Sequence, residues 1–569
     1  MSALTVPFLM PRVEEVVPDF AMLKDRLTGS SVVEERYTAT QVPSSGDTYT
    51  VGGTGTRLMI IRVANQNDYI DTSTMVLNFR AQGGTPSGAG VTGTTDLALD
   101  DHVLSMVDTI NVKVGGQTVE VLNNVGHLMN ALVQGSMPYN YYKQNGTFEG
   151  LYIYDKWNDT INLGYPGAGG SAAGVGTQNA NTTFPANDPD VTNSSLIDTK
   201  WTVGNRWLSL GRYYSVPLTL LGLCRIPTLF AARNFQDVTI EILFRSQLQG
   251  CCWSQTPTSS VTSGQQINIS DVTLTYDCCR MSADYYALMD NELKMPNGSG
   301  VAYAVDTYQV QPASIPAGTA PLASNPVGNV ATQLTNYSAA QSVSNLTRIV
   351  VAKGTRFLKG VYGVTKPTNS ETSYAWRNNS TNGNFSFSSY QVIINSKRYP
   401  QLQIQSSANA FQELQKAYNQ LGSVAGGALI SWWNYVGHPR LRLNCANGTV
   451  AVAGTFAPAP ITTPQDFVLA GKDGTTLGAF AGDEAMFQNG VNLEQFLTNQ
   501  PDAGGINTST SGYQIAIEIA NNGYANTPVA QGATGGNTGA LDSSPLTHYV
   551  ILHFTRVLTL KAGAVEVLD

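Results

Sequence analysis

Apolar and polar side chains alternate in many short segments of this 569-residue chain. The clearest example is 102–122, where Ile110 and Val112 fall on one face of an extended chain while Asn111 and Lys113 fall on the other. A spacing of two residues is that of a β-strand with one face buried. The pattern therefore predicts strands as the main elements.

Gly115 and Gly116 interrupt this segment and predict a tight hairpin, because glycine adopts the positive φ angles that such turns require. Val119 and Val121 then continue the return strand. Similar segments, bounded by Gly, Pro and Asn, recur in both halves of the chain. They predict strands at 32–42, 57–64, 70–80, 212–220, 236–246, 270–278, 301–311, 346–352, 385–396, 466–470, 512–520 and 547–560.

Two segments have the spacing of a helix with one apolar face. The first follows Asn124, which we expect to cap it. Its apolar stripe consists of Val125, Leu128, Met129 and Leu132. The second follows Ser406 or Ser407 and ends before Gly422. Its stripe consists of Phe411, Leu414, Tyr418 and Leu421. Both stripes predict packing against a core and not a cofactor-binding surface.

A third helical pattern near 283–300 ends in Pro296-Asn297-Gly298 and divides the chain into two similar halves. Each half offers several strands, one short helix and long inserts, which favours one β-sandwich per half. We therefore expect an N-terminal arm at 1–30, a first sandwich at 31–282, a linker at 283–300 and a second sandwich at 301–569. The inserts are rich in Gly, Ser, Thr, Asn and Pro and lie at 82–97, 164–200, 247–268, 313–340 and 500–545.

Charged residues are unusually few, at 13% of the chain, whereas 42% are hydrophobic. The charged fraction is about half the common value, and polar uncharged residues with 55 Gly and 26 Pro take its place. A weakly charged surface loses little solvation when it meets a neighbour, as in protein interfaces. An extracellular β-protein with polar loops would have the same composition, so the alternatives stay open at this level.

The formal net charge is −8, and no run of basic residues occurs. Direct binding to nucleic acid needs Lys and Arg to replace counterions, so we expect little of it. No apolar stretch is long enough for a transmembrane helix. The first residues also lack the basic and apolar regions of a secretory signal.

The sequence offers no strong chemical signature. Six cysteines, at 224, 251, 252, 278, 279 and 445, have no metal-ligand spacing, and we expect them to be reduced. The glycine-rich segment 52–56 precedes a strand and predicts a turn and not a phosphate site. Asp100-Asp101-His102 is more typical of a solvated turn than of a catalytic group. We expect no catalytic, cofactor-binding or metal residues.

The other candidates are weighed in the same way. His127, His438, His548 and His553 have no carboxylate or cysteine partner at useful spacing. Trp432-Trp433 could stack on a sugar or a base, but an aromatic pair beside strands is more often packing. Sequons such as those at Asn145 and Asn345 matter only in secreted proteins.

Several strings, taken in order, resemble one family, the double jelly-roll major capsid proteins of virophages and Polinton-like viruses. YIDTSTMVLNFR resembles the first strands of that family's first barrel, and THYVILHFTRVLTL resembles its final strand. At 124–125, Asn-Val stands where Asn-Tyr is more usual. The matching segments are 69–80, 105–132, 215–245, 271–293, 389–423 and 547–560.

The resemblance implies an all-β chain of two tandem eight-stranded jelly-roll β-sandwiches with short helices and long loop insertions. It also implies a homotrimer that forms a pseudo-hexagonal capsomer. Such capsomers tile an icosahedral capsid around double-stranded DNA in the virion, assembled inside the infected cell. Penton and minor capsid proteins would be the other partners.

Three alternatives remain. A carbohydrate- or receptor-binding β-sandwich protein would use the same folds and could use the Trp pair. A β-sandwich glycoside hydrolase would need two carboxylates placed about 5–9 Å apart. A single parvovirus-like jelly roll with very long loops would have one set of strands, whereas the sequence offers two.

Overall fold

The computed structural model describes only part of the chain. The described residues are 33–53, 55–63, 68–84, 97–99, 101–138, 141, 145, 149, 151–152, 212–226, 228–235, 237–248, 251–254, 266–294, 301–315, 345–351, 353–368, 387–418, 430, 435, 487–494, 505–509, 514–521, 546–561 and 564–568. The expected arm at 1–30 and the expected strand at 466–470 lie outside these residues.

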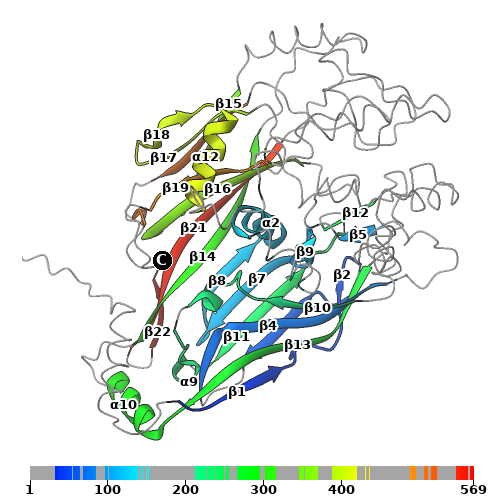
Figure 1. Ribbon diagram of the computed structural model, residues 1–569, viewed down its shortest axis with the longest axis vertical. Coiled ribbons are helices and arrows are strands. Elements are labelled where there is room, and N and C mark those ends of the chain that lie inside the picture. Colours follow the sequence, from blue (N-terminus) through cyan, green and yellow to red (C-terminus); the bar gives the residue numbers. More distant parts are fainter. Residues whose placement is uncertain are drawn as a thin grey trace, which may run out of the picture.

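Eight strands of the N-terminal half form two antiparallel sheets (Figure 1). The strands are β1 Val33–Gln41, β3 Leu58–Val63, β4 Tyr69–Gly84, β7 Val107–Val114, β8 Gln117–Asn123, β10 Arg212–Pro217, β11 Val238–Phe244 and β13 Gln266–Met281. One sheet has the order β1–β13–β4–β10 and the other β3–β11–β7–β8. Apart from the hairpin of β7 and β8, successive strands thus change sheets, and the last lies beside the first, which is the strand order of a jelly roll.

The C-terminal half repeats this order. Its strands are β14 Val301–Ile315, β15 Asn345–Val351, β16 Phe357–Pro367, β17 Phe387–Ile394, β18 Lys397–Ile404, β19 Asn489–Asn492, β20 Ile515–Asn521 and β21 Leu546–Lys561. The sheets are β14–β21–β16–β19 and β15–β20–β17–β18. Counted within each half, both sandwiches have the same strand order, so the expected fold of two tandem jelly rolls is confirmed.

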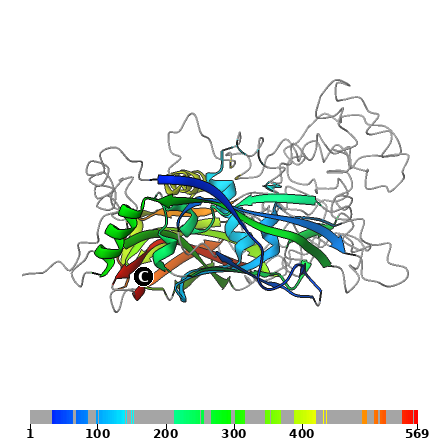
Figure 2. The same cartoon turned by 90° about the horizontal axis from the view of Figure 1, so that it is seen from below.

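Shorter elements surround these sheets. The strands are β2 Tyr49–Val51, β5 Leu97–Leu99, β6 Asp101–His102, β9 Leu151–Tyr152, β12 Cys252–Ser254 and β22 Ala564–Leu568. The helices are η2 Val103–Met106, α2 Val125–Ser136, η4 Gly222–Arg225, α9 Ala232–Phe235, α10 Ala283–Lys294 and α12 Ser407–Ala417. Between β13 and β14 the chain passes through α10, which stands at one margin of the described molecule (Figures 1 and 2).

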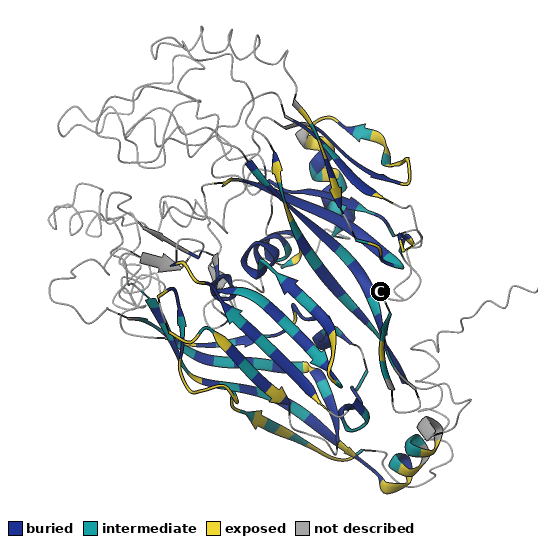
Figure 3. Cartoon of the chain, turned by 180° about the vertical axis from the view of Figure 1, so that it is seen from behind, coloured by how far each residue is buried: buried dark blue, intermediate teal, exposed yellow. Residues whose placement is uncertain are grey.

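The alternation of apolar and polar residues becomes an alternation of buried and partly exposed ones (Figure 3). Ile110 and Val112 are buried in the first sandwich, whereas Asn111 and Lys113 are only partly covered. Gly115 and Gly116 have φ angles of 55° and 79° and form the expected hairpin turn. The expected strand at 102–122 is shorter at its start, because residues 103–106 form η2.

A bulge breaks the alternation in β8. The register shifts between Val112 and Lys113, which face Glu120 and Thr118 across the ladder. Val119 is the extra residue in β8, as expected for a β-bulge. Both Val119 and Glu120 are therefore fully buried, a result that period-two reasoning did not predict.

The two expected helices form, but only one has the expected cap. Ser406 caps α12, with its side chain accepting a hydrogen bond from the amide of Asn409. Asn124 does not cap α2 through its side chain, contrary to our expectation. Its backbone is left-handed, with φ 52°, whereas a capping side chain requires an extended backbone.

Strands β14 and β21 extend beyond the neighbouring strand β16 of the second sandwich. β16 pairs with β21 only between Leu546 and Thr555, and β22 pairs with it from Val557 to Lys561. The ribbon β14–β21–β22 thus continues past the second sandwich and runs alongside the first, where β14 and β22 contact β8 (Figure 1). We call it the shared ribbon.

The hairpin turn tests whether β22 holds the first sandwich. A Cβ on Gly115 would lie 2.7 Å from Cγ2 of Val565, whereas nothing lies within 4 Å of one on Gly116. Both substitutions place alanine at a positive φ, which costs roughly 1–2 kcal/mol. We expect Gly115→Ala to lower the thermal unfolding midpoint more than Gly116→Ala does.

The additional substitution Val565→Ala separates the two causes. It should recover part of the loss in Gly115→Ala and none in Gly116→Ala. Equal midpoints for the two glycine variants, measured by calorimetry, would show that β22 does not press on the turn.

Candidate functional site: the junction between the two sandwiches

Glu120 is the central residue of the junction between the sandwiches. The bulge in β8 turns its carboxylate inward, and its exposed fraction is 0%. The carboxylate oxygens accept hydrogen bonds from the amide of Gly222, at 3.1 and 3.0 Å. The hydroxyl of Thr307, on β14 of the second sandwich, donates to Oε1 at 2.6 Å. A side chain of the first sandwich is thus satisfied by a group of the second.

Burial raises the pKa of Glu120, although the bonds from Thr307 and Gly222 and the nearby guanidinium groups of Arg225 and Arg556 act in the opposite direction. A buried carboxyl with no such partners would be costly in either protonation state. The junction therefore depends on several groups that must be present together.

Arg225, the last residue of η4, reaches from the first sandwich to β14. Its Nη2 donates to the carbonyl oxygen of Asp306 at 2.5 Å, and Nη1 donates to the hydroxyl of Tyr308 at 3.1 Å. The guanidinium carbon also lies 4.9 Å from the centre of the Tyr308 ring, within the range of a cation–π contact. In the reverse direction, Arg556 of β21 donates to the carbonyl oxygen of Val119 at 2.5 Å.

Asp306, two residues before Tyr308 on β14, belongs to a second charged group. Lys359 forms an ion pair with Asp306 at 2.6 Å, and the hydroxyl of Thr555 donates to the same oxygen at 2.5 Å. The exposed fraction of the Lys359 side chain is only 5%. Burial alone would raise the pKa of Asp306, but His553 and Lys359 outweigh it and hold the pKa below its ordinary value. Asp306 is therefore an anion committed to this pair.

Close backbone approach also joins the sandwiches. A Cβ on Gly222 would lie 2.0 Å from the carbonyl oxygen of Asp306, so only glycine fits there. Further along β14, the Tyr303 hydroxyl accepts from the amide of Ala231 at 2.9 Å and donates to the carbonyl of Leu229 at 3.2 Å. These contacts fix β14 along the length of η4 and α9.

Two helices complete the junction at its other end. Tyr418, which follows α12, donates to the carbonyl of Ala131 in α2 at 3.1 Å. The amide of Gln488 donates to the side chain of Gln134 at 3.0 Å. A Cβ on Gly135 would overlap the Tyr418 ring, at 2.1 Å. Tyr418, a member of the second predicted apolar stripe, thus packs against α2 of the other sandwich.

The histidines have structural surroundings in the described part of the chain. Nδ1 of His102 accepts a hydrogen bond from the amide of Leu104 at 2.8 Å and caps η2. His127 stacks near Tyr549, with ring centres 4.1 Å apart, and so lies in the junction. The ring of His548 meets the hydroxyl of Thr365 at 2.9 Å. His438 and Trp432-Trp433 lie outside the described residues.

The cysteines and glycine-rich turn also have plain structural roles. Cys224, Cys251, Cys278 and Cys279 are all buried. Gly52 and Gly53 have φ angles of 70° and 72°, which are those of a turn. Among the described residues, no group of three or more His, Cys, Asp or Glu side chains could hold a metal ion. Within the same residues, no helix is long and apolar enough to cross a membrane.

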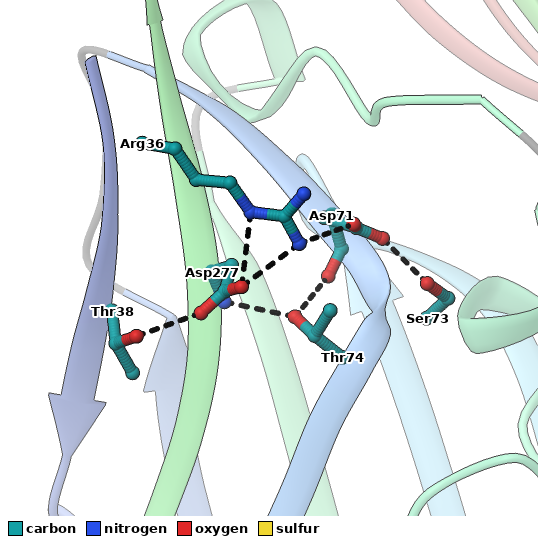
Figure 4. Close-up of polar contacts among 6 residues, drawn as sticks. All are labelled: Arg36, Thr38, Asp71, Ser73, Thr74 and Asp277. Carbon is teal, nitrogen blue, oxygen red and sulfur yellow. Dashed lines mark hydrogen bonds and ion pairs between the residues drawn. The ribbon is translucent and has the colours of Figure 1, made fainter.

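One pair of carboxylates meets on the outer face of the first sandwich (Figure 4). Arg36 binds Asp277 at 2.9 Å and Asp71 at 3.1 Å, and so ties β1 to β13 and β4. Hydrogen bonds from Thr38 and Arg36 hold the pKa of Asp277 below its ordinary value. A glycoside hydrolase needs one carboxyl with a raised pKa in such a pair. This network instead binds both carboxylates to one guanidinium.

No known family model matches the sequence, and no curated protein resembles it closely enough to count as a relative. Solved structures with a similar backbone include the Faustovirus major capsid protein, at 9% identity and a TM-score of 0.48 over 94% of this chain and 92% of that one. A chain of the Sputnik virophage structure has 11% identity and a TM-score of 0.48, over 95% and 89% of the two chains. The mavirus major capsid protein has 8% identity and a TM-score of 0.45, over 95% and 91%.

The junction can be tested by cutting the connection between the sandwiches. We expect a chain with a protease site placed between Lys294 and Val301 to keep its two halves together after cleavage, because the buried contacts remain. Replacing Arg225 with Met removes one of the two guanidinium groups near Glu120 and the hydrogen bonds to Asp306 and Tyr308, and should cost about 3 kcal/mol or more. Tyr308→Phe removes one hydrogen bond and should cost about 1 kcal/mol.

Size-exclusion chromatography after cleavage provides the measurement. The halves of the unsubstituted chain and of Tyr308→Phe should elute together, and those of Arg225→Met should separate at a lower denaturant concentration. If the cleaved halves of the unsubstituted chain separate, the junction contacts do not hold the two sandwiches together.

Proposed function

We propose that this chain is the major capsid protein of an icosahedral double-stranded DNA virus. The observation behind the proposal is the buried junction, which holds two jelly rolls in one fixed arrangement. Two independent binding modules on a chain would instead meet through a small polar contact or a flexible linker. A pair of similar barrels held in one fixed arrangement is suited to serve as a building block of a larger assembly.

The duplication accounts for the proposed capsomer. Three chains, each with two similar barrels, place six similar units around a threefold axis and produce a pseudo-hexagonal outline. Closed cyclic symmetry of this kind is the usual form of homo-oligomers. Pseudo-hexagonal units can then tile a shell, with a separate penton protein at its vertices and minor capsid proteins as further partners.

Charge supports the same function. Only 13% of residues are charged, which suits repeated contacts between neighbouring capsomers. The net charge of −8 gives the chain little to bind DNA with. The protein would then be located in the capsid of the virion and enclose the genome without gripping it.

The absence of an enzymatic role belongs to the proposal as well. The ionisable side chains of the junction are committed to one another, and the pair of Asp71 and Asp277 is bound by Arg36. We further propose that the barrels span 31–282 and 301–569, joined by 283–300. The N-terminal arm is proposed to span 1–30.

Oligomeric state tests the proposal directly. We expect the purified protein to be a trimer, with three times the chain mass of 60.8 kDa, and to associate further into sheets or shells as concentration rises. Light scattering measures the mass, and negative-stain electron microscopy should show pseudo-hexagonal particles. A monodisperse monomer at micromolar concentration would overturn the proposed function.

A further inference from the structure

We propose that the junction is an acid-sensitive latch, in which protonation of His553 weakens the hold of η4 on β14 while each sandwich keeps its own fold. This property belongs to the single chain. It goes beyond the proposed function and does not depend on assembly into a shell.

Three side chains form a stack in the latch. The rings of His553 and Tyr308 lie parallel within 19°, with centres 4.7 Å apart. Arg225 lies 4.9 Å from the centre of the Tyr308 ring and donates to its hydroxyl. The Tyr308 ring thus contacts both the imidazole and the guanidinium. A neutral imidazole fits beside these groups, whereas an imidazolium adds a positive charge near Arg225.

The charged groups around His553 come from several elements. β14 contributes Asp306 and η4 contributes Arg225, while Lys359 comes from β16. Glu120 of β8 and Arg556 of β21 form the adjoining pair, and Glu494 acts on Asp306 and Lys359. Within the described part of the chain, the anion that acts directly on His553 is Asp306, and one oxygen of Asp306 already binds Lys359 and Thr555.

One nitrogen of the imidazole has no acceptor for a second proton. Nε2 of His553 is buried and has no hydrogen-bond partner among the described residues. A proton added at Nε2 would therefore be a buried donor without a partner, which is unfavourable. In agreement with this geometry, burial lowers the pKa of His553 to about 3. Asp306 has the next largest effect on this pKa and opposes the lowering, while Arg225 and then Lys359 add to it.

The direction of the pH dependence follows from linkage. In an opened junction His553 meets water and titrates near its ordinary pKa of about 6.5. Below that pH, His553 binds a proton in the open form and not in the closed form. The ratio of closed to open junction therefore falls by up to roughly tenfold per pH unit between about 6.5 and 3. Above about 6.5 the latch is insensitive to pH through this residue.

Hydrogen exchange of the full chain tests the latch. After correction for intrinsic rates, protection of the amides of Gly222–Arg225 and of β14 should fall roughly tenfold per pH unit from pH 6.5 to 5. Amides of β11 and β20, inside the two sandwiches, should lose much less. His553→Gln keeps a neutral polar side chain and should make the protection of η4 and β14 independent of pH in this range.

A second variant keeps the test decisive if His553→Gln does not fold. Lys359→Gln removes a cation and frees Asp306 to stabilise an imidazolium, so it should also reduce the pH dependence. The latch is wrong if His553→Gln or, failing that, Lys359→Gln follows the unsubstituted chain. It is equally wrong if β11 and β20 open together with η4. A trimer with a pH-independent junction would refute the latch and leave the proposed function intact.

Discussion

The burial of Glu120 against the second sandwich is the constraint on which the rest of the structure depends. Its carboxylate is removed from water by a bulge in its own strand and is satisfied by Thr307 across the junction. A buried ion or acid of this kind adds less to stability than an apolar contact, but loss of one partner is costly. The arrangement therefore favours one relative placement of the two jelly rolls over others that apolar packing alone would allow.

The same constraint explains why the two sandwiches, although similar in strand order, contribute differently to the junction. Both sandwiches have the strand order of a jelly roll, and the second extends β14 and β21 alongside the first. The extension provides a surface on which η4 and β8 can pack. The two halves have the same strand order, and the shared ribbon joins them into one body.

Much of the fold could be predicted from the sequence because period-two patterns reflect which face of a strand is buried. The hairpin at Gly115 and the cap at Ser406 are local features that sequence reveals. The junction could not be predicted, since it joins residues such as Glu120 and Thr307 that lie 187 positions apart. The bulge that buries Glu120 leaves no composition signal, and β16 was missed because its Gly and Lys residues interrupt the apolar pattern.

The position of the shared ribbon in the sequence also determines when the junction can form during synthesis of the chain. β21 and β22 follow every other described strand in the sequence, so a ribosome exports them after the first sandwich is complete. Until they arrive, the surface of β8 that they cover is open to other chains. A partly made or shortened chain therefore leaves this surface exposed to wrong association, whereas in the finished chain β21 and β22 cover it.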